Sequence, residues 1–391
     1  MRPLEGLLVV ALEHAIAAPL CTRQLADLGA RVIKIERPGQ GDFARSYDAR
    51  ARGLASHFVW CNRGKESLTL ELKHAGARAV LQTLVARCDV LVQNLAPGAA
   101  ARMGFSHASL EAANPRIVVC DISGYGEGGP WTDKKAYDLL IQSESGFVSV
   151  TGTPAQPSKA GLAIADIAAG MHAYSGVLAA LLERGRTGRG QRLEISMLEA
   201  MAEWMGFPLY YTLDGQPPPP RAGASHAAIY PYGPFVCGDG KQVVLAVQHD
   251  REWSVFCRDV LRLPALADAY RGNEKRVAEQ ATLGAIIEAV CATLSAPELL
   301  ARLDAAGIAN ARLNEMADLW SHPQLAARGR WAEVGTPGGP LPALLPPHHL
   351  SGTAAPPMGQ VPGLGEHTSA ILAELGYGAN DVARLRAEGA V

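Results

Sequence analysis

Asp166 is the residue around which chemistry can be built in this sequence. A stretch with small residues at 160, 161, 163 and 165 leads up to it. Apolar residues then recur at helical spacing over 171–182 and end at Gly185, so Asp166 falls between a loop and a helix. Its carboxylate could cap this helix by accepting hydrogen bonds from the first free N–H groups. It could instead be a nucleophile that forms a covalent acyl intermediate, because the positive end of the helix would lower its pKa and keep it ionised.

Motifs for several other chemistries are missing from the sequence. The seven cysteines form no C-x-x-C pair, and no His, Cys or carboxylate cluster has metal-ligand spacing, so no bound metal is predicted. EHAIAAP stands where a G-x-G-x-x-G fingerprint would follow the first apolar run, and GYGEGGP (124–130) lacks the Lys-Ser/Thr of a P-loop. Both observations argue against NAD and ATP. A phosphate-bearing ligand could still be held by Arg37, Lys73, Arg102 and Lys135.

The composition is that of an ordinary globular protein. With 48% hydrophobic residues and a formal net charge of -2, the 391-residue chain gives no reason to expect nucleic acid or an acidic membrane surface as a partner. No apolar run of about 18 residues predicts a membrane span. The first apolar run breaks at Glu13 and His14 and is typical of a strand, not of a signal peptide. We therefore expect a cytoplasmic protein of two domains.

Strands and helices alternate in the N-terminal half. Apolar patterns predict strands at 7–12, 31–36, 67–72, 89–95, 116–122 and 192–197, and helices at 18–28, 76–87 and 198–209. This alternation predicts an α/β domain with a doubly wound, Rossmann-like parallel sheet. Such sheets bind ligands beyond the carboxyl ends of their strands, where the loops 14–17, 37–39 and 94–95 are expected.

A smaller α+β domain is predicted over residues 225–320. The proline-rich stretch DGQPPPPRAGASH (214–226) indicates a semi-rigid linker near its boundary. A strand at 242–248 and helices at 252–261, 275–294 and 297–306 follow. The Pro- and Gly-rich stretch 335–362 predicts a strap without long elements, followed by a helix at 368–375. Residues 1–210, completed by 325–391, would form the large domain.

Eight segments spread over nearly the whole chain carry a family resemblance. They are LADLGARVIKIERPGQGDFAR, NRGKESLTLELK, LVQNLAPGAAARMGF, ISGYGEGGP, KKAYD, ADIAAGMHA, RGRTGRGQRLEISM and PGLGEHT. In this order they resemble the class III CoA-transferases, also called the CaiB/BaiF or formyl-CoA transferase family. The resemblance implies transfer of CoA from an acyl-CoA to a free carboxylic acid, without a permanently bound cofactor. It places Asp166 at the family's catalytic aspartate, which would carry the covalent acyl and CoA intermediates.

The resemblance also implies which residues contact CoA. The backbone of Ala15, Ile16 and Ala17 would lie against the CoA moiety. Adenine and phosphate contacts would come from Arg37, Leu70, Lys73, Asn94, Leu95, Arg102 and Met103, and contacts beside the pantetheine arm from Lys135, Tyr137 and Met197. The resemblance further implies an interlocked homodimer.

The expected substrates follow from a departure from the family pattern. AGASHAAI (222–229) stands where formyl-CoA transferases carry a glycine-rich loop over the active site, so a formyl or oxalyl substrate is not expected. Arg221 and His226 could instead recognise the second carboxylate of a short dicarboxylic acid such as succinate, malate, mesaconate or glutarate. His226 could equally be a loop histidine without a ligand. Succinyl-CoA or a similar dicarboxylyl-CoA is the expected donor.

Two other functions stay open at this point. A 2-methylacyl-CoA racemase of the same fold would carry a histidine at the position of Tyr137, and a tyrosine is a poor general base at neutral pH. Asp138 would be its partner carboxylate only by default, and a structural or orienting role is expected for it. A non-catalytic acyl-CoA-binding protein should lack a carboxylate at position 166, which this chain keeps.

Overall fold

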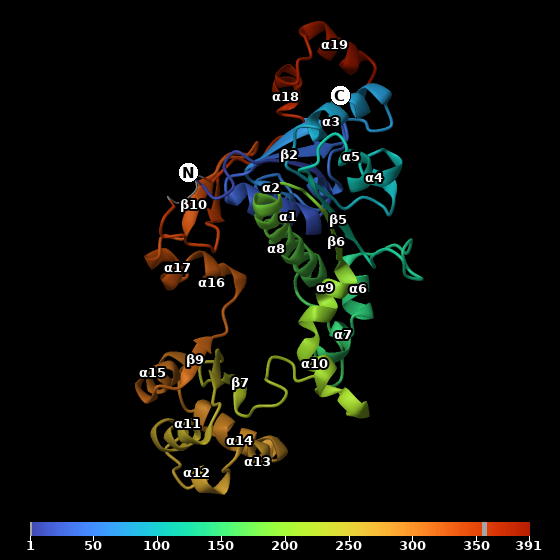
Figure 1. Ribbon diagram of the computed structural model, residues 1–391. Coiled ribbons are helices and arrows are strands. Elements are labelled where there is room, and N and C mark those ends of the chain that lie inside the picture. The colour runs from blue at the N-terminus through green and yellow to red at the C-terminus, as the bar shows by residue number, and fades with distance from the viewer. Residues whose placement is uncertain (1, 354–357) are drawn as a thin grey trace. The chain divides into compact units, whose positions relative to one another are not determined.

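Two compact units make up the protein in a computed structural model, which describes residues 2–353 and 358–391 (Figure 1). Unit 1 comprises Met1–Ser145, Ala160–Gly206 and Leu325–Val391, and unit 2 comprises Gly146–Lys159 and Phe207–Gln324. The predicted division into 1–210 with 325–391 and 225–320 differs from these units mainly at 146–159, which belongs to unit 2.

Unit 1 is built on a six-stranded parallel sheet in the order β3-β2-β1-β4-β5-β6. The strands are β1 (Leu8–Leu12), β2 (Arg31–Glu36), β3 (Lys65–Thr69), β4 (Val90–Gln93), β5 (Val118–Ser123) and β6 (Arg192–Ser196). The strand order reverses between β1 and β4, which is the position where doubly wound sheets open a crevice for ligands.

The third strand begins earlier than predicted. Apolar residues indicated a strand at 67–72, but β3 pairs with β2 over Lys65–Thr69. The side chains of Lys65, Ser67 and Thr69 are buried and hydrogen-bonded to polar partners. A search for alternating hydrophobic residues does not detect a strand whose buried positions are polar.

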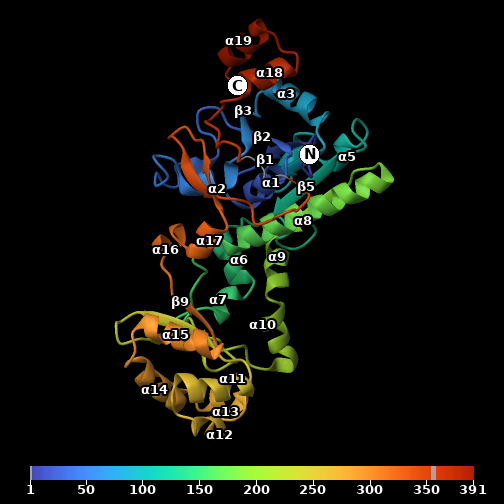
Figure 2. The same ribbon diagram turned by 90° about the vertical axis from the view of Figure 1, so that its left-hand side faces the viewer.

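Helices cover both faces of the sheet (Figure 1, Figure 2). On one face, α3 (Ala75–Val85), α18 (Thr368–Glu374) and α19 (Ala379–Ala387) share an apolar core with the strands. On the other face, α1 (Ala17–Asp27) packs against α8 (Ile164–Thr187). Gly170 permits this close packing, because a Cβ there would lie 2.7 Å from the carbonyl oxygen of Ala17.

The helices around position 166 differ from the predicted ones. α8 begins at Ile164, before the apolar spacing becomes regular, and the single helix predicted at 198–209 is instead α9 (Met197–Trp204) and α10 (Gly206–Tyr211), separated near Gly206. α8 is long and apolar enough to cross a membrane, contrary to the sequence expectation, but core helices of soluble proteins share that property. In α8, 44% of the most apolar window is buried.

Unit 2 contains a three-stranded antiparallel sheet, β7 (Tyr232–Val236), β8 (Gln242–Ala246) and β9 (Ala309–Arg312). Only β8 was predicted, because β7 contains Gly233 and Pro234 and β9 is short and polar. The helices of this unit are α7 (Phe147–Val150), α10 except for Gly206, η2 (Leu213–Gly215), α11 (Asp250–Val255), η3 (Phe256–Val260), α12 (Leu266–Ala269), α13 (Asn273–Ala278), α14 (Gln280–Cys291), α15 (Ala296–Ala306) and α16 (Met316–Trp320).

The C-terminal segment of unit 1 lies along the sheet edge at β3. β10 (Trp331–Val334) and β11 (Leu341–Leu344) form a hairpin. β11 lies within the stretch 335–362 that was predicted to lack long elements, and β10 directly precedes this stretch; residues 354–357 lie outside the described residues. The N–H of Ser67 donates to Nδ1 of His367. The remaining helices of unit 1 are η1 (Phe43–Ser46), α2 (Ser56–Asn62), α4 (Ala99–Arg102), α5 (His107–Leu110) and α6 (Asp138–Glu144), and α17 (Pro323–Ala327) crosses the unit boundary.

Candidate active site

Asp166 is the third residue of α8, and its side chain is half-buried. The N-cap residue is Ala163, and the acceptor for the first N–H groups comes from another helix. Oδ1 of Asp138, the first residue of α6, accepts hydrogen bonds from the backbone N–H of Ala165 at 2.8 Å and of Asp166 at 3.4 Å. The reading of Asp166 as the helix cap is therefore wrong, and Asp138 takes that role.

The prediction that the helix lowers the pKa of Asp166 is also wrong. Burial, and after it the negative charge of Asp138, together raise the pKa of this carboxyl from 3.8 to about 7. Charge repulsion and desolvation thus outweigh the favourable helix dipole, which is worth only about 0.3–1 kcal/mol in most settings. Asp166 is poised between its protonated and ionised forms near neutral pH.

The raised pKa has a consequence for stability that can be measured. Holding this carboxyl ionised opposes folding. That penalty is absent below pH 4, grows as the pH rises from 4 to 7, and is complete above 7. We expect Asp166→Asn to raise the free energy of unfolding by about 2 kcal/mol at pH 8, below the ~4 kcal/mol that three full pKa units would give because solvent reaches the site. Urea unfolding at pH 8 and pH 4 checks this, and an equal gain at both values would contradict it.

The loop after β1 lies against the start of α8. Ile16 and Ala15 belong to one apolar cluster with Ala163 and Ile167, which lie three residues before and one residue after Asp166. Oδ1 and Nδ2 of Asn94 form two hydrogen bonds of 2.9 Å with the backbone of His14. The sequence resemblance assigned Asn94 to CoA. In the structure this side chain instead holds the backbone of the loop that packs near Asp166.

A second clamp acts on the same loop at Ala15. This residue has a φ of 60°, and its N–H donates to Oδ1 of Asp42 at 3.1 Å. A left-handed backbone is unfavourable for alanine, so the bond to Asp42 stabilises a conformation that the local sequence disfavours. The shape of loop 14–17 therefore depends on groups distant in sequence.

A buried ionic network anchors the second of these clamps, Asp42. Nζ of Lys34 lies 2.8 Å from Oδ2 of Asp42 and 3.3 Å from Oε1 of Glu13, and all three side chains are fully buried. Lys65 donates to Glu13 at 2.6 Å and to the Pro19 carbonyl at 2.9 Å. Burial lowers the pKa of Lys65 to about 8, an effect that Glu13 opposes. The network connects the sheet to the main chain of the active-site loop.

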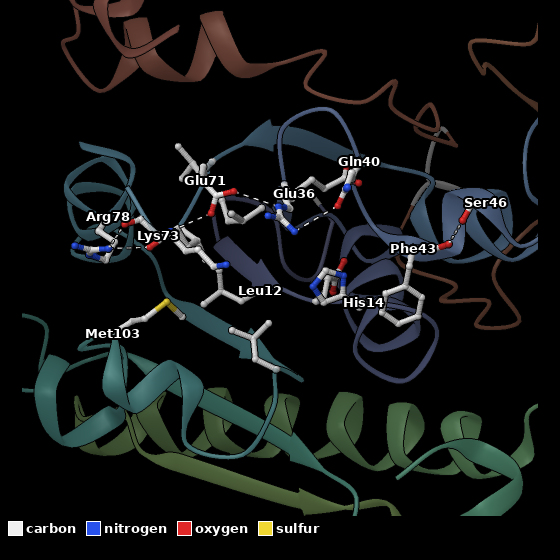
Figure 3. A pocket seen from close by; sticks show the side chains of 17 residues that line it. Leu12, His14, Glu36, Gln40, Phe43, Ser46, Glu71, Lys73, Arg78 and Met103 are labelled. Carbon is white, nitrogen blue, oxygen red and sulfur yellow. Dashed lines mark hydrogen bonds and ion pairs between the residues drawn. The ribbon is translucent and has the colours of Figure 1, made fainter. Parts of the chain in front are cut away.

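A cleft of about 980 Å³ opens at the carboxyl ends of the strands β1 to β4 (Figure 3). Its apolar side chains come from strand ends and the loops after them, and charged side chains surround them. The lining residues are Leu12, Glu13, His14, Ile35, Glu36, Arg37, Gln40, Gly41, Phe43, Ser46, Leu70, Glu71, Leu72, Lys73, Arg78, Leu95 and Met103. The structure thus brings together Arg37, Leu70, Lys73, Leu95 and Met103 of the predicted CoA contacts.

The cleft is suited to a ligand with an apolar ring and anionic groups. Lys73 and Arg78 lie toward one end, and His14 and Phe43 lie toward the other (Figure 3). The rings of His14 and Phe43 are stacked with centroids 5.3 Å apart. Arg37 is paired with Glu71 at 3.1 Å, so an incoming phosphate would compete with that carboxylate. A volume of this size holds a nucleotide-sized group.

The other predicted CoA contacts lie outside this lining. Arg102 lines a separate cleft of about 340 Å³ and donates to the Pro97 carbonyl. Lys135 is exposed, and Tyr137, which precedes α6, is 68% exposed. Met197 is buried at the start of α9.

Arg221 and His226 belong to unit 2. The guanidinium of Arg221 donates to the carbonyls of Ser149, Thr153 and Pro154 at 2.9–3.1 Å, which ties residues 149–154 to this unit. This explains why segment 146–159 departs from the predicted domain division. Nδ1 of His226 accepts the N–H of Ala228, and its ring stacks on Tyr232.

Sequence reasoning missed four residues that shape the site. Asp42 and Phe43 stand in the motif GQGDFAR, and a buried lysine on the neighbouring strand could have indicated that Asp42 is its partner. Arg78 had no signal beyond a basic residue in the first turns of a helix. Gln142 is fully buried and accepts the N–H of Ala160, a partner that only the tertiary fold brings near. Its other partner, Asp138, is four residues earlier on the same helix, and this spacing was the available signal.

Comparisons with known proteins identify the family of this chain. The family model of CoA-transferase family III matches residues 4–368. Succinyl-CoA:glutarate CoA-transferase from Mus musculus is 33% identical, covering 100% of this chain and 91% of the relative. Succinate–glutarate CoA-transferase from Agrobacterium fabrum is 33% identical, covering 95% and 96%. Acetyl-CoA:oxalate CoA-transferase from Acetobacter aceti is 34% identical, covering 87% and 88%.

A solved structure of similar fold belongs to the same family. The crystal structure of a CaiB/BaiF family protein from Brucella suis matches with a TM-score of 0.86 at 33% identity, covering 96% of this chain and 99% of that one. The chain therefore belongs to CoA-transferase family III. It is a CoA-transferase, and the resemblance stated from the sequence is confirmed.

Proposed function

We propose that this chain transfers CoA from a short dicarboxylyl-CoA, with succinyl-CoA as the expected donor, to a free short-chain dicarboxylate. One observation carries the proposal: the half-buried Asp166 adjoins the loop at the mouth of a nucleotide-sized cleft. This arrangement supports Asp166 as the carboxylate that reacts with an acyl-CoA whose nucleotide would occupy the cleft.

Asp166 acts as the nucleophile in two half-reactions. Its carboxylate attacks the acyl carbon of the donor, the C–S bond breaks, and CoA thiolate leaves behind a mixed anhydride. The thiolate then attacks the Asp166 carbon of the anhydride, which releases the donor acid and leaves CoA bound to Asp166 as a thioester. The acceptor carboxylate attacks this thioester and frees the thiolate, which attacks the acceptor's acyl carbon. The new acyl-CoA departs and the Asp166 carboxylate is restored.

The chain's own residues bind CoA and position the reacting groups. Arg37 and Lys73 attract the phosphates, Leu70 and Met103 contact the adenine, and the backbone of residues 15–17 lies along the CoA moiety. We retain Asn94, Leu95, Arg102, Lys135, Tyr137 and Met197 in the same proposal. CoA is a substrate here, and the chemistry calls for no permanently bound cofactor.

The nature of the acids rests on the relatives. Two of them are named for succinate and glutarate, which favours a dicarboxylate for this chain. The relative named for oxalate is 34% identical, so identity alone does not separate the acceptors. Arg221 and His226 stay in the proposal as contacts for the second carboxylate, although Arg221 already binds three carbonyls.

We include a cytoplasmic homodimer in this proposal. Several large apolar side chains of unit 1 are exposed, among them Leu139 and Leu140 of α6, Leu182 of α8 and Trp204 of α9. Exposed apolar surface of this kind is typical of a face that another chain covers.

A panel of acids tests the function. Purified protein is mixed with succinyl-CoA and, one at a time, glutarate, malate, mesaconate and oxalate, and the acyl-CoA products are identified by mass spectrometry. We expect a new acyl-CoA from at least one C4 or C5 dicarboxylate and none from oxalate. If no acid accepts CoA while a chiral 2-methylacyl-CoA exchanges its α-proton with solvent, the racemase would replace this proposal.

A further inference from the structure

A short chain of hydrogen bonds connects α6 to the start of α8. Asp138 Oδ1 accepts the N–H groups of Ala165 and Asp166, and Asp138 Oδ2 accepts from Nε2 of Gln142 at 2.6 Å. Oε1 of Gln142 in turn accepts the N–H of Ala160 at 2.9 Å. Both carboxylate oxygens of Asp138 are therefore occupied, and its side chain has one defined orientation.

We propose that Asp138 is a positioning residue for Asp166. Asp138 fixes the first turn of α8 and places a second negative charge beside the nucleophile. This inference rests on the proposed function, because it requires Asp166 to be the residue that becomes acylated. Gln142 supports it by orienting the carboxylate of Asp138.

The two negative charges of Asp138 and Asp166 affect the equilibrium between the free enzyme and its covalent intermediates. As a free carboxylate, Asp166 repels Asp138 in a half-buried setting where solvent screens the charges poorly. As an anhydride or a thioester, Asp166 carries no charge, so the repulsion is lost. Asp138 therefore raises the energy of the free enzyme relative to the covalent states, and it favours their formation.

Asp138 is the charged group that acts on Asp166 from α6, and the phenol of Tyr47 also interacts electrostatically with Asp166. The other elements packed against α8 are α1, α9, β5 and β6. Four of the charged side chains of α1, β5 and β6 form ion pairs with one another, Arg23 with Asp27 and Arg192 with Asp121. The remaining ionisable side chains of these elements and of α8 are Cys21, Cys120, Glu194, Glu199, Glu203, His172, Tyr174, Glu183, Arg184 and Arg186.

A double variant separates the charge from the hydrogen bonds. In Asp138→Asn with Gln142→Glu, the asparagine oxygen still accepts from residues 165 and 166. Its amide now donates to the glutamate, which still accepts the N–H of Ala160. The negative charge moves one side chain further from Asp166 while the hydrogen-bond pattern is kept. The control is Glu144→Gln, which removes a charge from the same helix where the carboxylate pairs with Lys134.

Two readouts test the inference in the wild type and these variants. One is the pH dependence of kcat/KM, and the other is the fraction of protein carrying covalent CoA at a fixed ratio of succinyl-CoA to succinate. In the double variant we expect the midpoint of the pH profile to move below that of the wild type, and the adduct fraction to fall roughly 3–10-fold. Glu144→Gln should match the wild type in both readouts.

The outcomes distinguish this inference from the proposed function. An adduct on Asp166 with an unchanged midpoint and fraction in the double variant would overturn the role of Asp138 alone. If Asp166→Ala, run in parallel, retains the adduct or the activity, the nucleophile itself is misassigned. Thermal unfolding of each variant shows whether a loss of the adduct merely reflects a loss of folded protein.

Discussion

Replacement of Asp166 by alanine is expected to lower the turnover number of CoA transfer by at least about 10³-fold, because the reaction loses the group that forms both covalent intermediates. The CoA cleft is lined by other residues, so the dissociation constant for CoA should stay within about threefold of the wild-type value. Initial rates with succinyl-CoA and the best acceptor, together with calorimetric titration of CoA, measure the two quantities separately.

Asp166→Asn serves as the matched control for shape. An amide of nearly the same size cannot form the anhydride under these conditions, so it should be as inactive as alanine while remaining folded. Substantial activity in either variant, after removal of any contaminating wild-type protein, would refute the assignment of the nucleophile.

Asp42→Ala is expected to reduce the free energy of unfolding by about 3–5 kcal/mol, the usual effect of removing one partner from a buried ion pair. Burial opposes the ionisation of Asp42, but the ammonium of Lys34 and hydrogen bonds hold the pKa of this carboxyl below its usual range. Its removal would leave Lys34 with Glu13 as its anionic partner and release the N–H groups of Ala15 and Ala44.

Urea unfolding at pH 7 measures this loss. The control is Glu127→Ala, whose carboxylate is 60% exposed and pairs with Arg192 at the surface, so its unfolding midpoint should hardly change. Equal midpoints for Asp42→Ala and the control would show that the ionic network does not support the active-site loop as described.

Most strands of the sheet in unit 1 could be predicted from the sequence because they carry apolar residues in runs or in alternation with polar ones. β2 at Arg31–Glu36 has the predicted bounds, and the bounds of β1, β4, β5 and β6 lie within two residues of those predicted. β3 departs because its buried residues are polar, and the hairpin β10–β11 was missed because its strands are short and flanked by Pro and Gly. The sequence pattern predicts strands and helices that bury apolar side chains. It fails for elements whose position is set by hydrogen bonds between buried polar side chains.

The position of Asp166 at the start of a helix could be predicted, but its surroundings could not. The cap comes from Asp138, 28 residues earlier in the chain, and the direction of the pKa change depends on that same tertiary contact. Similarly, Asn94 was expected to touch CoA, and its two hydrogen bonds to His14 are visible only in the fold. The residue types indicated CoA-transferase chemistry, and the tertiary contacts determine what each residue does in the site.

The most direct test of this account is to locate the covalent intermediate. Wild-type protein is incubated with succinyl-CoA alone, quenched in acid, digested and analysed by peptide mass spectrometry, with a parallel sample treated with hydroxylamine. We predict CoA in thioester linkage to Asp166, converted by hydroxylamine to the hydroxamate at the same residue. CoA on another residue, or steady transfer without any adduct, would contradict the central claim that Asp166 is the nucleophile.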